Sequence, residues 1–169
     1  DTFAASLKYT FWKEEFLTWQ TLYELPKSDN YDEALNAVSK GNISFNFFYA
    51  DKDHNIHYKL TGKYPKRDDG VDPRFFRKGT GEEEWTGFIP FDELPSSDMN
   101  AQNYYINWNN KPADWWNQGD NLPWLRTTHT GTIVDAMENF LAPKPAVSYE
   151  DIKAIPEEID AHGSYQQAL

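Results

Sequence analysis

Residues 104–112 read YYINWNNKP, and this stretch offers a clear choice between a structural and a chemical role. A tryptophan ends a short apolar run, Asn109 and Asn110 follow it, and a proline comes two residues later. Asparagine is a poor strand former and is common in turns, so a turn is the simplest interpretation. A side-chain amide is also an N–H donor, and such donors stabilise the oxyanion that forms when an amide carbonyl is attacked. The residue types alone leave both interpretations open.

Several other familiar catalytic motifs are missing from the sequence, and nothing in it indicates a Ser-His-Asp triad, although its composition allows one. It contains no cysteine, which excludes a thiolate nucleophile, a cysteine-ligated zinc and a disulfide framework. The four histidines are scattered, and we expect His54 and His57 to be surface or structural residues. No G-x-S-x-G, H-E-x-x-H, P-loop or dinucleotide-binding pattern occurs. The carboxylates of Asp68–Asp69 and Glu82–Glu84 are typical of solvated loops.

Charge and composition exclude several classes of partner. The 169 residues include 27 Asp and Glu against 16 Lys and Arg, a formal net charge of −11, which repels nucleic-acid phosphates. No run approaches the roughly 18 apolar residues of a membrane span. Aromatic residues make up 17% of the chain, whereas disordered chains are depleted in them. We therefore expect one globular unit that binds neither nucleic acid nor a membrane through a span.

The elements that would position YYINWNNKP follow from periodicity. Residues 1–42 are predicted to be helical, with one helix over Thr10–Leu25 that Pro26 ends. A second helix is predicted in SDNYDEALNAVSKGN, between polar caps and Gly41. Residues 43–62 alternate around the turn DKDHN and predict a β-hairpin whose first strand is buried on both faces.

The rest of the chain is predicted to be loops followed by helices. Residues 63–126 are rich in glycine and proline and predict long wrapping loops that hold one strand, at 104–108. Residues 127–169 predict a helix from about Thr132 to Leu141 and another that starts at Ser148. We expect both ends of the chain to be cuts in a longer polypeptide.

Three blocks of the sequence resemble the penicillin acylase family, in the family's order and spacing. SFNFFYADKDHNIHYKLTGKYP resembles its N-x-x-Y-A-D-x-x-G-N-I-x-Y-x-x-x-G-x-x-P pattern. DDGVDPRFFRKGTGEEEWTGFIPFDELP is similar to its G-x-D-x-R … G-T-G … W-x-G-x-x-P-F-x-x-x-P loop, and YYINWNNKP to its Y-I-x-N-W-N-N-x-P. The resemblance covers nearly the whole chain.

The resemblance implies a fold and an activity. The family consists of N-terminal nucleophile hydrolases, so we expect an α+β fold: an internal segment of the large chain of a four-layer αββα sandwich. In the family a serine at the start of the large chain attacks a linear amide, and its own α-amino group is the base. Asp1 is not that serine, so the isolated chain is expected to be inactive. The implied partners are the small chain, the rest of the large chain and a small-molecule amide, in an extracytoplasmic parent related to enzymes that act on antibiotics.

The resemblance also implies roles for single residues. Asn109 matches the asparagine whose side-chain amide donates to the oxyanion of the tetrahedral intermediate. Trp19 and Phe45 match positions that line the acyl pocket, and both would otherwise be core residues. A family arginine has Arg126 as its nearest counterpart, although His129 occupies a comparable place.

The family also implies a metal near the active site. No cofactor takes part in its chemistry, but a structural calcium ion is bound by a backbone carbonyl that matches Pro73 and a carboxylate that matches Asp120. Calcium takes about six to eight oxygens, so these two residues make only a partial site.

One hypothesis from another class competes with the acylase. Tryptophan and tyrosine on a polar surface can stack on sugars, which would make the chain a non-catalytic module that binds glycans. Amidase activity of the complete protein and glycan binding by the chain alone distinguish the two.

Overall fold

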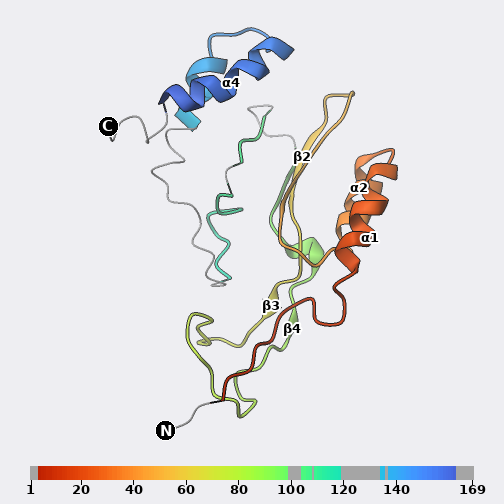
Figure 1. Ribbon diagram of the computed structural model, residues 1–169, viewed down its shortest axis with the longest axis vertical. Helices are drawn as coiled ribbons and strands as arrows, with labels where there is room; N and C mark the ends of the chain where they lie inside the picture. Colours follow the sequence, from red (N-terminus) through yellow and green to blue (C-terminus); the bar gives the residue numbers. More distant parts are fainter. Residues whose placement is uncertain (1–3, 99–103, 108, 119–133, 136, 163–169) are drawn as a thin grey trace. The chain divides into compact units, whose positions relative to one another are not determined.

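The computed structural model describes residues 4–98, 104–107, 109–118, 134–135 and 137–162 (Figure 1). These residues belong to two compact units, which we describe one at a time. The first lies within residues 1–105 and 112–121, and the second within residues 106–111 and 122–169. Helices and strands both occur, as the sequence predicts.

The first unit begins with a pair of helices. α1 (Leu17–Glu24) runs into the 3-10 turn η1 (Leu25–Lys27), and α2 (Tyr31–Val38) follows. Asn30 caps α2, because its side-chain oxygen accepts the backbone N–H of Glu33 at 3.0 Å. The Glu33 carboxylate in turn accepts the N–H of Asp29 at 3.0 Å, which completes a reciprocal cap. The second helix therefore falls where the sequence predicts it.

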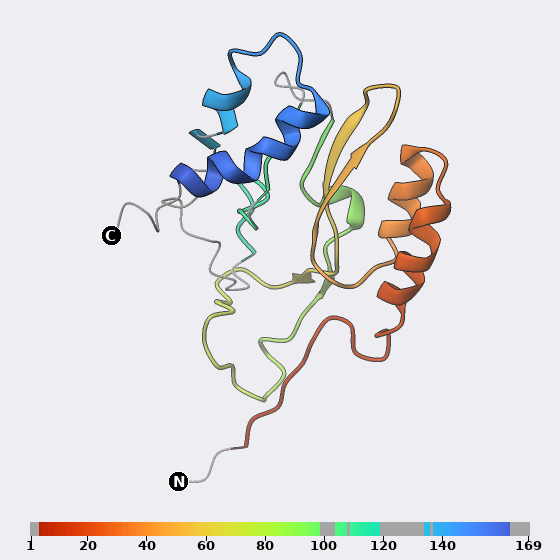
Figure 2. The same cartoon turned by 45° about the horizontal axis from the view of Figure 1, so that its top comes forward.

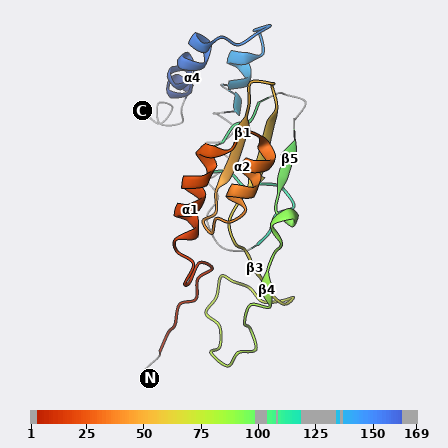
Figure 3. The same cartoon turned by 90° about the vertical axis from the view of Figure 1, so that its right-hand side faces the viewer.

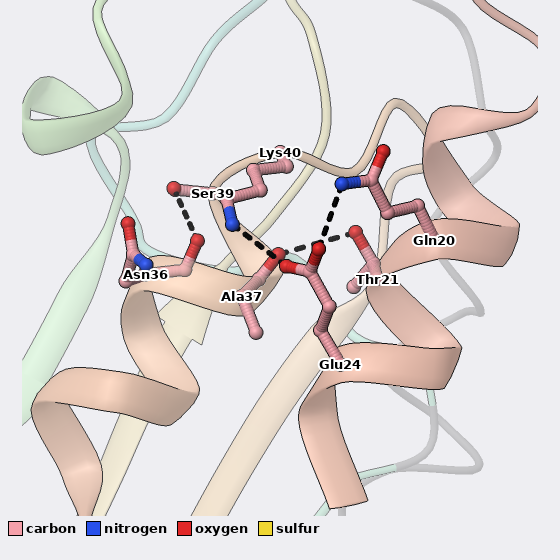
Figure 4. Close-up of polar contacts among 7 residues, drawn as sticks. All are labelled: Gln20, Thr21, Glu24, Asn36, Ala37, Ser39 and Lys40. Atoms are coloured by element: carbon pink, nitrogen blue, oxygen red, sulfur yellow. Dashed lines mark hydrogen bonds and ion pairs between the residues drawn. The ribbon is translucent and has the colours of Figure 1, made fainter. Parts of the chain in front are cut away.

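Polar contacts join α1 to α2 (Figure 4). The buried Thr21 hydroxyl donates to the carbonyl oxygen of Ala37 at 3.1 Å. Lys40 reaches the Glu24 carboxylate at 2.7 Å, and Gln20 donates to the same carboxylate at 2.7 Å. Small side chains on α2 are buried at this contact, so the two helices approach closely through residues with little bulk.

The first helix is shorter than the sequence predicts. It begins at Leu17, seven residues after Thr10, and residues 10–13 form a turn instead. Lys13 has φ of +66°, a left-handed conformation that a right-handed helix does not allow. The apolar spacing continues through this turn, which is why periodicity alone extended the helix too far.

A three-stranded antiparallel sheet stands beside the helices (Figure 2). Its strands are β1 (Asn46–Ala50), β2 (Ile56–Leu60) and β5 (Ser96–Asp98), in the order β1-β2-β5. In the β1–β2 turn, the Asp51 carboxylate accepts the N–H groups of Asp53 and Asn55 at 2.9 and 3.0 Å. The predicted hairpin is therefore present, with its turn at the predicted residues.

Burial within this sheet differs from the prediction. β1 is an edge strand whose residues are half-buried or exposed, and Phe48 is 37% exposed. β2 lies in the centre, and its last three residues are buried. The prediction that the first strand is buried on both faces is wrong, because no residue of β1 is buried. β5 pairs with β2, so β1 is at the edge of this sheet.

A second, two-stranded sheet is formed by β3 (Pro65–Lys66) and β4 (Gly87–Phe88) (Figure 3). A small core includes residues of β2 and of the segments that follow it. The turn η2 (Phe91–Glu93) leads from β4 to β5. Tyr64 and Trp116 meet edge to face, with ring centroids 5.1 Å apart. The buried core residues are Tyr58, Leu60, Tyr64, Leu94 and Trp116.

Residues 104–107 form no strand, although the sequence predicts one at 104–108. Tyr105 is held by its side chain instead. Its hydroxyl donates to the Ser97 carbonyl oxygen at 3.0 Å, and its ring packs near the ring of Phe48. The aromatic run therefore contributes ring packing to the first unit rather than a ladder of backbone hydrogen bonds.

The second unit is helical where it is described. Residues 134–135 and 137–141 are helical, within the predicted helix, and α4 (Tyr149–His162) starts one residue after Ser148. Ser148 and Asp151 cap α4, because the Ser148 hydroxyl accepts the Asp151 N–H at 3.2 Å and the Asp151 carboxylate accepts the Ser148 N–H at 2.9 Å. Within the described ranges, every helix is too short or too polar to cross a membrane.

Candidate functional site

Asn109 lies in a turn with a left-handed backbone. Its φ is +62°, a region in which asparagine is several-fold enriched over most other residues. Its backbone N–H donates to the side-chain oxygen of Asn107 at 3.2 Å, the contact of an Asx turn. The turn interpretation of YYINWNNKP is therefore correct for the backbone at this position.

The side chain of Asn109 is engaged differently from that of its neighbour. Asn109 is exposed, and its side-chain amide forms no hydrogen bond with any residue that the structure describes. Asn110 is half-buried, and its amide nitrogen donates to the carbonyl oxygen of Lys111 at 3.2 Å. One asparagine thus helps to close the turn, while the other presents a donor at the surface of its unit.

Trp19 lies on the face of α1 that points away from α2. Thr18 and Thr21 face inward, since the Thr18 hydroxyl accepts the N–H of Asn42 and Thr21 binds α2. Spacings of three and four residues put Phe16, Trp19 and Tyr23 together on the opposite side. Their exposed fractions are 82%, 69% and 69%. We call these three residues the α1 aromatic stripe.

Phe45, the other predicted pocket residue, precedes β1 and is 56% exposed. Its carbonyl oxygen accepts the N–H of Thr61 at 2.9 Å, which ties its backbone to the residue after β2. Trp19 and Phe45 both belong to the first unit, and Asn109 belongs to the second. Neither aromatic residue is a core residue of the first unit.

The predicted metal ligands are only partly described. Pro73 is half-buried in a turn, and the neighbouring Asp72 carboxylate binds the Arg74 guanidinium at 2.9 and 2.6 Å. These hydrogen bonds lower the pKa of Asp72 to about 2. Asp120 lies outside the described residues, as do Arg126 and His129.

The described residues do not amount to a calcium site. Across the part of the chain that the structure describes, no group of three or more His, Cys, Asp or Glu residues could hold a metal ion. The Asp72 carboxylate beside Pro73 is bound by Arg74, and calcium takes about six to eight oxygens.

His57 has a structural role, as the sequence predicts, but its partners were not predicted. Its Nδ1 atom lies 2.9 Å from the Asp98 carboxylate of β5. Its ring stacks on Tyr31 of α2, with centroids 3.7 Å apart and planes 9° from parallel. Burial, followed by the Asp98 charge, raises the pKa of Tyr31. These contacts fasten α2 to the sheet, and they join residues too far apart in sequence for a local pattern to predict.

Sequence reasoning also missed the buried Lys59. Only 4% of this β2 residue is exposed, and its ammonium donates to the carbonyl oxygen of Leu94 at 2.8 Å. The ammonium also lies 4.9 Å from the centre of the Phe91 ring. Burial lowers the pKa of Lys59. Alternation along β2 predicts that this lysine faces solvent. It is covered instead by residues 91–95, which follow much later in the sequence.

Asn107 is the missed residue closest to the candidate site. The sequence offered a signal for it, because an asparagine two residues before a turn position is typical of an Asx turn.

Comparisons with known proteins agree with the resemblance. A family model described as penicillin amidase matches residues 1–159. Penicillin G acylase of Escherichia coli is 40% identical over 86 residues, which cover 51% of this chain. A solved thermostable penicillin G acylase from Alcaligenes faecalis aligns with 89% of this chain at 30% identity and a TM-score of 0.77. The chain spans only 10% of the Escherichia coli protein and 26% of the Alcaligenes faecalis chain.

Proposed function

This chain belongs to the penicillin amidase family, and from that premise we propose that it is an internal segment of the large chain of an amidohydrolase. The parent enzyme would cleave a linear amide by transferring its acyl group to an N-terminal serine. The helices and strands of the first unit would form part of a four-layer αββα sandwich. The likeness to a solved penicillin G acylase over 89% of this chain supports that arrangement.

The proposed role of this segment is to stabilise negative charge. A serine supplied from outside these residues attacks the amide carbonyl, and its α-amino group takes the proton. The carbonyl oxygen then carries a negative charge in a tetrahedral intermediate. The side-chain amide of Asn109 donates a hydrogen bond to this oxygen. A donor fixed in advance stabilises the transition state more than the substrate.

The observation that carries this proposal is the state of Asn109. Its backbone is fixed by the contact with Asn107, at φ of +62°. Its side chain is exposed, and its amide donates to none of the described residues. A fixed backbone with a free donor is what an oxyanion-binding residue requires. Asn110, whose amide is used within the turn, lacks the second property.

The acyl group of the substrate would bind against aromatic side chains of the first unit. Trp19 and Phe45 are 69% and 56% exposed, so their rings are available to a ligand or to another part of the parent. An aromatic wall suits an apolar acyl group. The proposed substrate is therefore a small amide with an apolar, preferably aromatic, acyl part.

The calcium ion is a proposal for the complete enzyme only. Pro73 would give a backbone carbonyl and Asp120 a carboxylate, and the remaining oxygens would come from outside this chain. When bound, the ion would stabilise the loop that follows Pro73 and take no part in the chemistry. An arginine role for Arg126, with His129 as the alternative, belongs to the same proposal.

The glycan-binding alternative is not favoured. Membership of the penicillin amidase family accounts for nearly the whole chain without it. The exposed aromatics of the α1 aromatic stripe do not distinguish the two hypotheses, because sugars and apolar acyl groups both stack on such rings.

The test is to assay the complete parent polypeptide and the isolated chain side by side. Phenylacetyl anilide and a series of other acyl anilides serve as substrates, and a glycan array serves as the competing assay. We expect hydrolysis by the complete protein, none by the isolated chain above a buffer control, and no glycan binding. An inactive but fully folded parent, or glycan binding by the chain, would contradict the proposal.

A further inference from the structure

We propose that Asn107 is a positioning residue for the oxyanion donor: its side-chain carbonyl holds the Asn109 backbone in the conformation that aims the Asn109 amide. This inference rests on the proposed function, because it names the residue that fixes the conformation of the proposed oxyanion donor. Asn107 itself would touch neither the substrate nor the reacting atoms.

The geometry places the two residues in direct contact. The side-chain oxygen of Asn107 accepts the backbone N–H of Asn109, with 3.2 Å between the nitrogen and the oxygen. Asn109 has φ of +62°, a region that most L-residues disfavour and that asparagine occupies more readily. A local hydrogen bond to the backbone favours this conformation over the alternatives. The Asn107 carbonyl is a described contact that does so.

The direction of the Asn109 side chain depends on this backbone angle. If the Asn107 contact is lost, the backbone can relax to a negative φ, and the bond from the α-carbon to the β-carbon then points elsewhere. Catalysis is sensitive to such changes, since a displacement of about 1 Å at a reacting centre can lower the rate by about 10²-fold. Asn107 thus acts on the reaction only through Asn109.

This dependence separates Asn107 from a residue that merely stabilises the turn. A stabilising residue would change the fraction of folded protein and leave the turnover of the folded fraction unchanged. A positioning residue lowers kcat with little change in KM, because an oxyanion donor contributes mainly in the transition state. Replacement by another acceptor of similar reach should restore the rate.

The experiment is a double-mutant cycle in the complete parent polypeptide, with kcat, KM and melting temperature measured for each variant. Asn107→Ala removes the acceptor and should lower kcat by at least about tenfold with KM nearly unchanged. Asn107→Asp keeps an acceptor oxygen and should recover most of the rate. Asn107→Ser offers a weaker acceptor and should fall between the two. Asn110→Ala, in the same turn, is the control and should keep normal turnover.

The cycle is closed in the Asn109→Ala background. If Asn107 acts through Asn109, then adding Asn107→Ala to Asn109→Ala should lower kcat no further, because coupled residues are not additive. Equal losses in both backgrounds, or normal turnover in Asn107→Ala, would overturn the inference while leaving the role of Asn109 intact. If Asn107→Ala does not fold, Asn107→Gly, which also lacks the acceptor, takes its place, and normal turnover in that variant would overturn the inference equally. Normal turnover in Asn109→Ala alone would instead contradict the proposed function.

Discussion

At the scale of single residues, left-handed backbones mark the turns of this protein. The non-glycine residues with positive φ that the structure describes are Lys13, His54 and Asn109. Lys13 precedes α1, and His54 lies in the β1–β2 turn with its N–H bound to the Asp51 carbonyl oxygen at 3.3 Å. Asn109 is held by a side chain, so a single substitution at Asn107 can release it.

The cap of α4 makes a prediction about pH at the same scale. Lys144 binds the Asp151 carboxylate at 2.7 Å, and the Ser148 hydroxyl donates to it at 2.6 Å. These contacts, with Lys144 as the largest cause, lower the pKa of Asp151 below its ordinary value of 3.8. A carboxyl whose pKa is lower in the folded state stabilises the fold above its unfolded pKa, and this stabilisation is lost as the pH falls through the folded pKa.

We therefore expect the N-terminal turn of α4 to lose the stabilisation of its cap only below pH ~4. NMR titration of the Asp151 carboxyl should give a midpoint below 3.8, and Lys144→Met should move that midpoint upward. Lys153→Met, which removes the exposed pair between Lys153 and Glu150 at 2.9 Å, is the control and should leave it in place. A midpoint at the ordinary value in the unaltered chain would refute this account of the cap.

At the scale of elements, one glycine allows a close approach of the backbone at the open end of the β1–β2 hairpin. Gly62 follows β2 with φ of +107°, and a β-carbon there would lie 2.9 Å from the backbone of Ser44. Gly70 has φ of +85°, but a β-carbon there would meet nothing within 4 Å. Both glycines therefore have a positive φ that would strain an alanine, and they differ in the space around them.

Alanine at these two glycines should separate strain from crowding. Gly70→Ala should lower the free energy of unfolding by about 1–2 kcal/mol, through the left-handed backbone alone. Gly62→Ala adds about 1–3 kcal/mol for the contact with Ser44, and should be the more destabilising by that amount. Urea denaturation followed by tryptophan fluorescence measures both. Equal losses for the two variants would mean that Ser44 moves aside without cost.

The elements also show how far the sequence alone could be interpreted. The α2 cap, the β1–β2 turn and the start of α4 depend on neighbours within four residues, and all three fall at the predicted positions. The burial of Lys59 and the exposed edge of β1 depend on residues 91–98, far along the chain, and both were missed. The turn at Asn109 is local and was among the alternatives. The sequence analysis did not predict that the Asn107 side chain would accept the Asn109 N–H.

At the scale of the whole molecule, the first unit carries large aromatic side chains at its surface. Phe16 is 82% exposed and Phe76 fully exposed, although large apolar residues are usually buried. The chain spans 26% of the solved acylase chain that it resembles. Under the proposed function, other parts of the parent and its substrate would cover this surface.

We expect the isolated chain to bind calcium weakly or not at all. Pro73 and Asp120 alone cannot replace the shell of water around the ion, which needs about six to eight oxygen ligands. Titration calorimetry should show no binding in the micromolar range. Micromolar binding that Asp120→Ala abolishes would show instead that the chain carries a complete site.

The proposed role of Asn109 as a donor to the oxyanion is tested by comparing two forms of the parent enzyme. In the complete parent polypeptide, kcat and the melting temperature are measured for the unaltered enzyme and for Asn109→Ala. We expect kcat to fall by about 10²–10³, the usual effect of one lost donor, with KM and the melting temperature nearly unchanged. A lowered melting temperature with near-normal kcat in the folded fraction would show that Asn109 only shapes the turn, and would contradict the account.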